Sequence, residues 1–67
     1  MNPKKSGAKI KRLRESLGIT QTQLAEQVGV SVSSICKYEA GEKVPRDKTK
    51  IRLAEVLGRT TNYIFFK

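Results

Sequence analysis

Apolar residues recur at helical spacing near the start of the chain. Ile10, Leu13 and Leu17 stand three and four residues apart, which places them on one stripe of a helix. We expect this helix to run over residues 7–17. Ser6 is its expected N-cap, because a serine hydroxyl accepts a hydrogen bond from the unpaired amides of the first turn.

Two further helices have clear start signals. Thr20 followed three residues later by Gln23 forms a capping box. Gly29 can adopt the left-handed conformation that ends this helix. The next helix is predicted over residues 31–40, with Ser31 as its N-cap and a glycine directly after its end.

The pattern of residues toward the end of the chain predicts two more helices. Pro45 breaks the preceding helical pattern, and a helix is predicted over residues 47–57. A short aromatic helix is expected after Thr60 or Thr61. The alternation typical of a strand is sustained nowhere. Five helices joined by tight turns indicate an all-α bundle.

Residues 21–40 meet the requirements of one helix-turn-helix unit. Where two helices cross most closely a small side chain is needed, and Ala25 stands there; the turn needs a residue with positive φ, which Gly29 supplies. The other inward positions are all apolar: Leu24, Val28, Val30, Ile35 and Tyr38. A purely structural helical hairpin is the alternative, but it rarely meets every one of these conditions, so the pattern favours a DNA-binding unit.

The stretch GITQTQLAEQVGVSVSSICKYEAGEKVP, residues 18–45, resembles the Cro/C1-type (XRE) helix-turn-helix family of phage repressors and small regulators. A Thr-Gln pair opens the first helix, Leu-Ala and a turn Gly follow, and Tyr-Glu-x-Gly closes the second. The resemblance extends over residues 8–66. It implies a compact five-helix bundle of the lambda-repressor-like DNA-binding type. We expect a flexible basic lead over residues 1–5 and a single domain over residues 6–67.

The recognition helix, residues 31–40, is expected to enter the major groove with the face opposite its buried apolar residues. Four residues of that face are expected to contact base edges: Val32, Ser33, Cys36 and Lys37. Lys37 can donate to guanine O6 and N7, Ser33 can donate or accept, and Val32 can pack on a thymine methyl. For Cys36, a small residue on a half-exposed helix face is an equally good interpretation.

Six residues are expected at DNA phosphates: Thr20, Gln21, Ser34, Lys43, Arg46 and Lys9. Gln21 begins a helix, where free amides and the helix dipole favour an anion. The resemblance implies that Gln21 also braces a side chain of the recognition helix, and it places Lys43 and Arg46 in a loop beside the DNA backbone. The alternative for each single lysine is a solvated charge.

The resemblance further implies a structural ion pair between Arg14 and Glu39, joining the first helix to the end of the recognition helix. Two positions depart from the usual pattern of the family. Lys50 and Arg59 stand where apolar residues are common, and Ile51 is the expected substitute for the missing apolar side chain at Lys50.

The charge composition restricts the class of molecule that this chain is expected to bind. The 14 Lys and Arg residues exceed the 6 Asp and Glu residues and give a formal net charge of +8. Such an excess favours a polyanion, either nucleic acid or an anionic membrane surface. The cations gather in two stretches, residues 4–14 and 43–52, and neither has the broad apolar face of a membrane-surface helix. We therefore expect double-stranded DNA as the partner and no membrane.

The chain holds one cysteine and no histidine, which excludes a zinc site and histidine-based catalysis. It also has no nucleophile–base pair and no glycine-rich phosphate loop, so we expect no enzyme, no catalytic residue, no metal and no cofactor. A single thiol cannot form an internal disulfide, and no apolar stretch follows the N-terminal lysines as it would in a secretory signal. Both observations indicate the reducing cytoplasm.

These observations predict a transcriptional regulator, acting as a repressor, that binds a two-fold operator as a homodimer. One module of this size makes few base contacts, so specificity favours two copies. Phe65 and Phe66 are predicted at the dimer interface, since both cannot point into so small a core; one capping the core beside one exposed ring is the alternative. The alternative function is a protein-interaction module such as an antitoxin or antirepressor, with an unknown protein partner.

Overall fold

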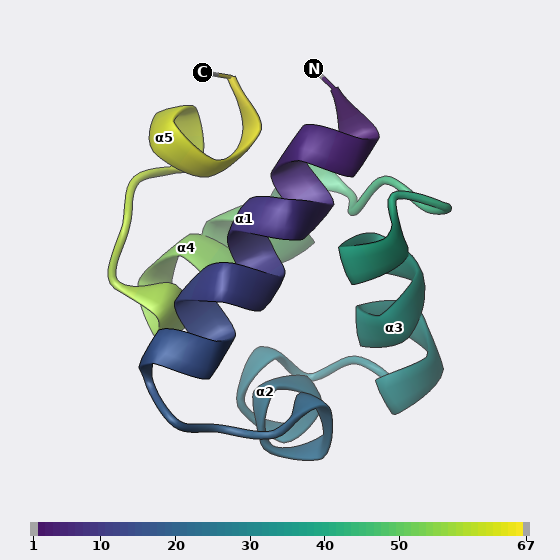
Figure 1. The fold of residues 1–67 in the computed structure, drawn as a ribbon, viewed down its shortest axis with the longest axis vertical. Helices are drawn as coiled ribbons and strands as arrows, with labels where there is room; N and C mark the ends of the chain where they lie inside the picture. Colours follow the sequence, from purple (N-terminus) through teal and green to yellow (C-terminus); the bar gives the residue numbers. More distant parts are fainter. Residues whose placement is uncertain (1, 67) are drawn as a thin grey trace.

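The computed structural model describes residues 2–66, which fold into five helices joined by short turns (Figure 1). The helices are α1 (Pro3–Ser16), α2 (Gln21–Val28), α3 (Val32–Ala40), α4 (Asp47–Leu57) and α5 (Thr61–Phe65). Met1, in the predicted lead, and Lys67, in the predicted domain, lie outside the described residues. Within residues 2–66 there is no strand, so the predicted all-α bundle is confirmed.

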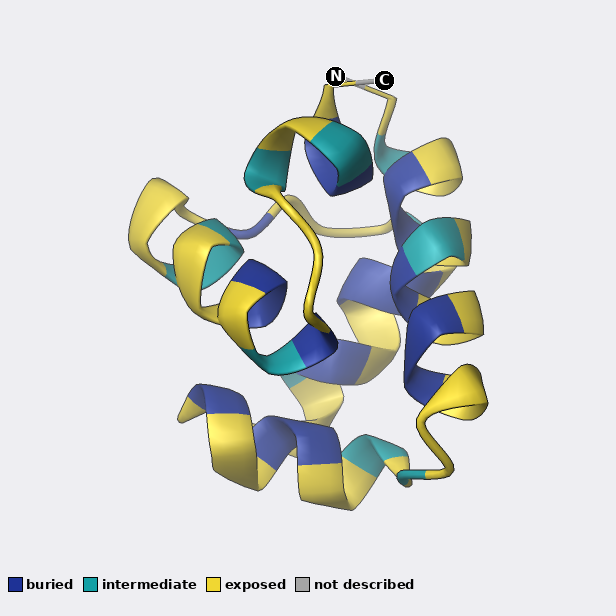
Figure 2. Cartoon of the chain, turned by 90° about the vertical axis from the view of Figure 1, so that its left-hand side faces the viewer, coloured by how far each residue is buried: buried dark blue, intermediate teal, exposed yellow. Residues whose placement is uncertain are grey.

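A single core lies between the helices. α1 packs against α3, α4 and α5, while α2 packs against α3 and α4. Each helix turns its buried side inward and its exposed side to solvent (Figure 2). The buried apolar residues are Ile10, Leu13, Leu24, Ala25, Val28, Ile35, Tyr38, Leu53, Ala54, Leu57, Ile64 and Phe65. Burying one such large side chain contributes about 1.5–3 kcal/mol, so this cluster holds α2 and α3 in place.

α1 begins earlier than the sequence pattern predicts. Asn2 is the N-cap, and its Oδ1 accepts a hydrogen bond of 3.1 Å from the backbone amide three residues on. Pro3 follows at the first helical position, where its missing N–H removes no helical hydrogen bond. The assignment of Ser6 as N-cap is therefore wrong, because Ser6 is buried inside the helix. Residues 3–5, expected in a separate lead, form the first turn of α1.

The predicted inward stripe of α1 is correct at Ile10 and Leu13 and wrong at Leu17. Leu17 is 51% exposed, whereas Ile10 and Leu13 are buried. The helix ends at Ser16 and Leu17 is its C-cap. The chain leaves the helix at this point, so the seven-residue spacing no longer sets the direction of the Leu17 side chain.

The predicted signals around α2 and α3 are confirmed. Thr20 Oγ1 accepts from the Gln23 amide at 3.0 Å, and the Gln23 Oε1 accepts from the Thr20 amide at 2.8 Å. Gly29 ends α2 with a φ of 86°, the left-handed conformation that glycine adopts without a steric penalty. Ser31 Oγ then accepts from the Ser34 amide at 3.1 Å and opens α3.

The backbones of α1 and α3 approach closely at two glycines. A Cβ added to Gly7 would lie 2.3 Å from the carbonyl oxygen of Tyr38 and 2.6 Å from that of Glu39. A Cβ added to Gly41, directly after α3, would lie 2.8 Å from the Cα of Lys4. The absence of a side chain at both positions lets the start of α1 lie against the end of α3.

The two phenylalanines at the end of the chain point in different directions. Phe65 is 2% exposed and belongs to the core, whereas Phe66 is 59% exposed. The expectation that both rings do not enter the core is thus correct. The assignment of Phe65 to a dimer interface is wrong, because the core of one copy already encloses this ring.

Lys50 packs into the structure at the position of α4 where an apolar residue is common in the family. Its side chain is largely buried, and its Nζ lies 5.5 Å and 5.2 Å from the ring centroids of Phe65 and Phe66. The aliphatic stem covers apolar surface while the ammonium lies over the rings. Ile51 is 56% exposed, so it does not substitute as expected. Arg59 likewise remains exposed, with its guanidinium 5.6 Å from the Tyr63 ring centroid.

Candidate nucleic-acid interface

One side of α3 is open to solvent. Ile35 and Tyr38 point into the core, with exposed fractions of 0% and 5%. The four residues expected at base edges are all classed as exposed: Val32, Ser33, Cys36 and Lys37. The structure therefore brings these four side chains to the accessible side of a single helix.

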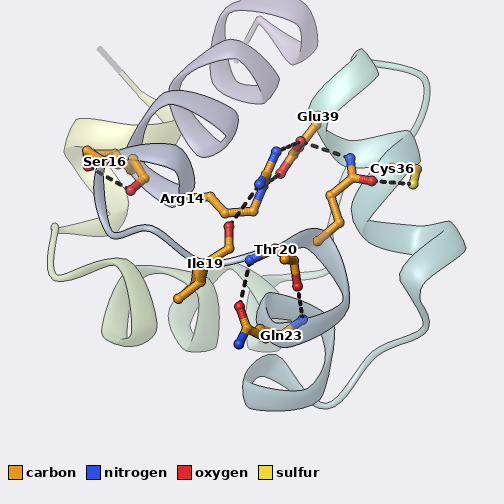
Figure 3. Close-up of polar contacts among 9 residues, drawn as sticks. Arg14, Ser16, Ile19, Thr20, Gln23, Cys36 and Glu39 are labelled. Atoms are coloured by element: carbon orange, nitrogen blue, oxygen red, sulfur yellow. Dashed lines mark hydrogen bonds and ion pairs between the residues drawn. The ribbon is translucent and has the colours of Figure 1, made fainter.

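Glu39 links the open helix to the rest of the molecule. Arg14 Nε lies 2.6 Å from Glu39 Oε2, and Arg14 Nη2 lies 3.1 Å from Glu39 Oε1 (Figure 3). Arg14 Nη1 also donates to the carbonyl oxygen of Ile19 at 2.9 Å. The ion pair expected between Arg14 and Glu39 is present, and both residues are buried. It ties α1 to the last turn of α3.

The charge state of this pair follows from its hydrogen bonds. The hydrogen bond to Glu39 raises the pKa of the Arg14 guanidinium, and this effect outweighs desolvation by burial, which lowers it. Arg14 is therefore a permanent cation, and its two-point contact orients the Glu39 carboxylate.

Gln21 connects α2 to the same carboxylate. Its Nε2 donates to Glu39 Oε1 at 3.0 Å, and its Oε1 accepts from the Cys36 Sγ at 3.1 Å (Figure 3). Gln21 thus braces α3, as the resemblance implies. Cys36 is exposed, but its thiol hydrogen bonds back to α2, so the geometry favours a supporting role for this residue.

Three of the residues expected at phosphates lie around one pocket. Ser34, Lys43 and Arg46 line a pocket of about 350 Å³ beside the start of α3, together with the hydroxyl-bearing Ser31 and Thr49. Lys43 Nζ is 3.4 Å from Ser34 Oγ and 5.8 Å from the Tyr38 ring centroid. Cations and hydroxyls near a helix N-terminus form a site suited to an anion.

Thr20 and Gln21 lie at the start of α2, where Thr20 caps the helix and Gln21 contacts the recognition helix. Lys9 does not join either group. Its Nζ donates to the Tyr63 carbonyl oxygen at 2.8 Å and lies 5.0 Å from the Tyr63 ring centroid. Figure 1 shows α5 and α3 on opposite sides of α1. The assignment of Lys9 to a phosphate contact is therefore wrong, because its ammonium is bound to α5.

Other kinds of site find no support in the described part of the chain. Within residues 2–66, no helix is both long and apolar enough to cross a membrane. Over the same residues, no group of three His, Cys, Asp or Glu side chains could hold a metal ion.

Comparison with known proteins identifies the family. The helix-turn-helix family matches residues 10–64, which include every helix except the first turns of α1 and the end of α5. The chain belongs to the XRE-type helix-turn-helix family. α2 and α3 are the two helices of its helix-turn-helix unit, and α3 is the helix expected from the sequence as the recognition helix.

Relatives of this helix-turn-helix protein are named as regulators. The chain is 33% identical over 58 residues to the SPbeta prophage-derived HTH-type transcriptional regulator YonR of Bacillus subtilis, covering 87% of this chain and 54% of YonR. It is 36% identical over 44 residues to the CTXphi transcriptional repressor RstR of Vibrio cholerae, covering 66% of this chain and 39% of RstR. The chain thus spans about half the length of YonR and less of RstR. These names agree with the sequence-based exclusion of an enzyme.

A solved structure shares the whole fold. The P22 c2 repressor, determined in complex with a synthetic operator, superimposes with a TM-score of 0.89 at 30% identity, covering 91% of this chain and 92% of that chain. The lambda-repressor-like fold expected from the sequence is therefore confirmed.

Two features that hold the helix-turn-helix unit in place do not follow from the sequence pattern. Gly7 permits the close contact between α1 and the recognition helix, and nothing in its helical sequence context distinguishes it from a tolerated glycine. The resemblance implies that Gln21 braces a side chain of the recognition helix without specifying which one, and the structure shows two partners, Glu39 and Cys36.

Proposed function

We propose that this protein is a sequence-specific DNA-binding transcriptional regulator that places α3 in the major groove of its operator. The observation that carries this proposal is the open side of α3, where Val32, Ser33 and Lys37 are exposed while the opposite side is locked into the core. An α-helix fits the major groove of B-DNA, and its outward side chains reach base edges there. The family and the fold of the P22 c2 repressor support the same reading.

The exposed side chains suit different base edges. Lys37 supplies a cationic donor for guanine O6 and N7, and Ser33 supplies a hydroxyl that donates or accepts. Val32, with an exposed fraction of 39%, offers an apolar surface for a thymine methyl. Cys36 contributes the surface of its sulfur, because its thiol hydrogen is directed to Gln21.

Phosphate contacts would fix the helix in the groove from two sides. Ser34, Lys43 and Arg46 form one group around the pocket at the start of α3. Thr20 and Gln21 form the other group at the start of α2, where free backbone amides favour an anion. Contacts of this kind position a protein on DNA and leave the choice of sequence to the base contacts.

The protein acts in this proposal as a homodimeric repressor on a two-fold operator. Phe66 and Ile51 are exposed at 59% and 56%, and both line a pocket of about 330 Å³ between α4 and α5. Asp47 and Lys50 line the same pocket. An apolar patch with opposite charges side by side is self-complementary across a two-fold axis, which favours a second copy as its partner. The relatives named as repressors support the direction of regulation.

Selection of duplexes from a random pool by the full chain tests the proposal. We expect recovered sites with two related halves about 10 base pairs apart, and a preference for them that persists as salt rises. The Ser33→Ala/Lys37→Ala double variant, changed at exposed positions alone, should keep its fold and lose the preference. Indifference to base sequence at every salt concentration would overturn the proposal and favour a protein-interaction module.

A further inference from the structure

The outer surface of α1 carries four cations that the proposed interface does not use. α1 contains six cations, of which Lys9 is bound to α5 and Arg14 to Glu39. The other four are exposed: Lys4, Lys5, Lys11 and Arg12. None of these four side chains forms an ion pair or a hydrogen bond with another side chain within residues 2–66.

The position of two of these cations works against the stability of the helix. Lys4 and Lys5 lie in the first turn of α1, and this turn contains no acidic residue. The helix dipole makes the N-terminal end electropositive, so cations there are unfavourable. The sole acid of α1 is Glu15, near the other end. Cations that do not stabilise the fold indicate an anionic partner outside the molecule.

The four cations divide into two pairs that face different neighbours. Lys11 lies between Gly7 and Arg14 on the helix surface, four residues after one and three before the other, and both of these residues contact α3. Lys4 is on the same side, seven residues before Lys11. Its Cγ lies 2.9 Å from the position of a Cβ on Gly41, the residue that ends the recognition helix.

Lys5 and Arg12 form the second pair, turned away from α3. On the helix surface they flank Lys9, four residues before it and three after it. Lys9 faces α5, to which its ammonium is bound. Both pairs have the same seven-residue spacing, and all four residues are exposed.

We propose that Lys4 and Lys11 bind phosphates of the duplex whose major groove receives α3. This inference rests on the proposed function. The major groove is about 12 Å wide and a helix with its side chains nearly fills it, so the sugar-phosphate backbone passes beside the recognition helix. Lys4 and Lys11 are about 10 Å apart along α1 and lie beside α3, within reach of that backbone.

Two variants with equal loss of charge test this inference. Lys4→Gln/Lys11→Gln and Lys5→Gln/Arg12→Gln each remove two cations from exposed positions of one helix. Affinity for the selected operator and for a random duplex is measured over a series of salt concentrations, with thermal unfolding as the check of the fold. We expect Lys4→Gln/Lys11→Gln to lower the slope of log affinity against log salt by about 1.8, or about 0.9 for each lost phosphate contact. Lys5→Gln/Arg12→Gln should leave the slope nearly unchanged.

Equal effects of the two variants would overturn the inference, because they would show a dependence on net charge alone. An unchanged slope in Lys4→Gln/Lys11→Gln would overturn it as well. In either case the unaltered chain still prefers its operator, so the proposed function stands. Failure of the unaltered chain to prefer any duplex is a different result, and it removes the proposed function itself.

Discussion

Gln21 Nε2 donates a 3.0 Å hydrogen bond to Glu39 Oε1, which ties the first residue of α2 to the last turn of the recognition helix (Figure 3). Arg14 holds the same carboxylate from α1. Three helices therefore meet at one buried carboxylate, and the angle at which α3 is presented depends on it. This arrangement makes Glu39 the most sensitive position beneath the proposed DNA interface.

Glu39→Ala should strongly destabilise the protein. The substitution leaves the buried Arg14 guanidinium without its partner, and breaking such a pair costs about 3–5 kcal/mol. Urea unfolding followed by circular dichroism measures the loss. Glu42→Ala, at an exposed position just past α3, is the matched control and should change stability by less than about 0.5 kcal/mol. A loss below about 1 kcal/mol for Glu39→Ala would show that the pair does not hold α3.

The stabilisation by Arg14 should not depend on pH across the neutral and mildly alkaline range. Its folded pKa is raised above the unfolded value, so its contribution is complete below the unfolded pKa and disappears as pH rises through the folded pKa. Both values lie far above neutral pH. The difference in unfolding free energy between the protein and Arg14→Met should stay constant from about pH 6 to pH 10. A decline within this window would contradict the assignment.

Lys37→Ala and Lys43→Ala should weaken DNA binding in different ways. Loss of a base contact at Lys37 should cost about 1–3 kcal/mol on the operator and relax the preference at one base pair. Loss of a phosphate contact at Lys43 should weaken all duplexes alike and lower the salt slope by about 1. Titration of operator and random duplexes at several salt concentrations separates the two. Equal losses on every duplex for Lys37→Ala would make Lys37 a phosphate contact.

Gly7→Ala should destabilise the protein, although helix propensity alone predicts a gain of about 0.5–1 kcal/mol. The added Cβ would meet the carbonyl oxygens of Tyr38 and Glu39, both backbone atoms that cannot move aside freely. We expect a loss of about 1–3 kcal/mol, as in other overpacked sites. Ala8→Gly, at the next and exposed position, is the control and should cost about 1 kcal/mol through propensity alone. A stabilised Gly7→Ala variant would refute the close contact.

Phe66→Ala and Phe65→Ala should separate self-association from folding. Phe66 is exposed, so its truncation should leave thermal stability nearly unchanged and reduce dimer formation in sedimentation. Phe65 is enclosed in the core, so its truncation should cost about 3–5 kcal/mol. Self-association of Phe66→Ala equal to that of the unaltered chain would exclude this patch from the interface.

Local signals in the sequence determined the helices and the family. Thr20 with Gln23, Ser31 and Gly29 act within one turn of the backbone, so their hydrogen bonds and φ values follow from neighbours along the chain. The open side of α3 follows in the same way, since burying Ile35 and Tyr38 leaves the other face of a regular helix outside. The ion pair between Arg14 and Glu39 was expected from the family resemblance alone, because no local spacing indicates it.

The tertiary structure alone decided which side chains meet across the core. Ala25 was the expected small residue at a close crossing, yet among the glycines the closest approach of another backbone lies at Gly7, which meets Tyr38, 31 residues further along the chain. The same holds for Lys9, which α5 draws away from α3, and for Phe65, which α5 turns inward. Each depends on how whole helices pack against one another. Periodicity assigns a residue to a face of its own helix, whereas the neighbour that covers this face is set by the packing of all five.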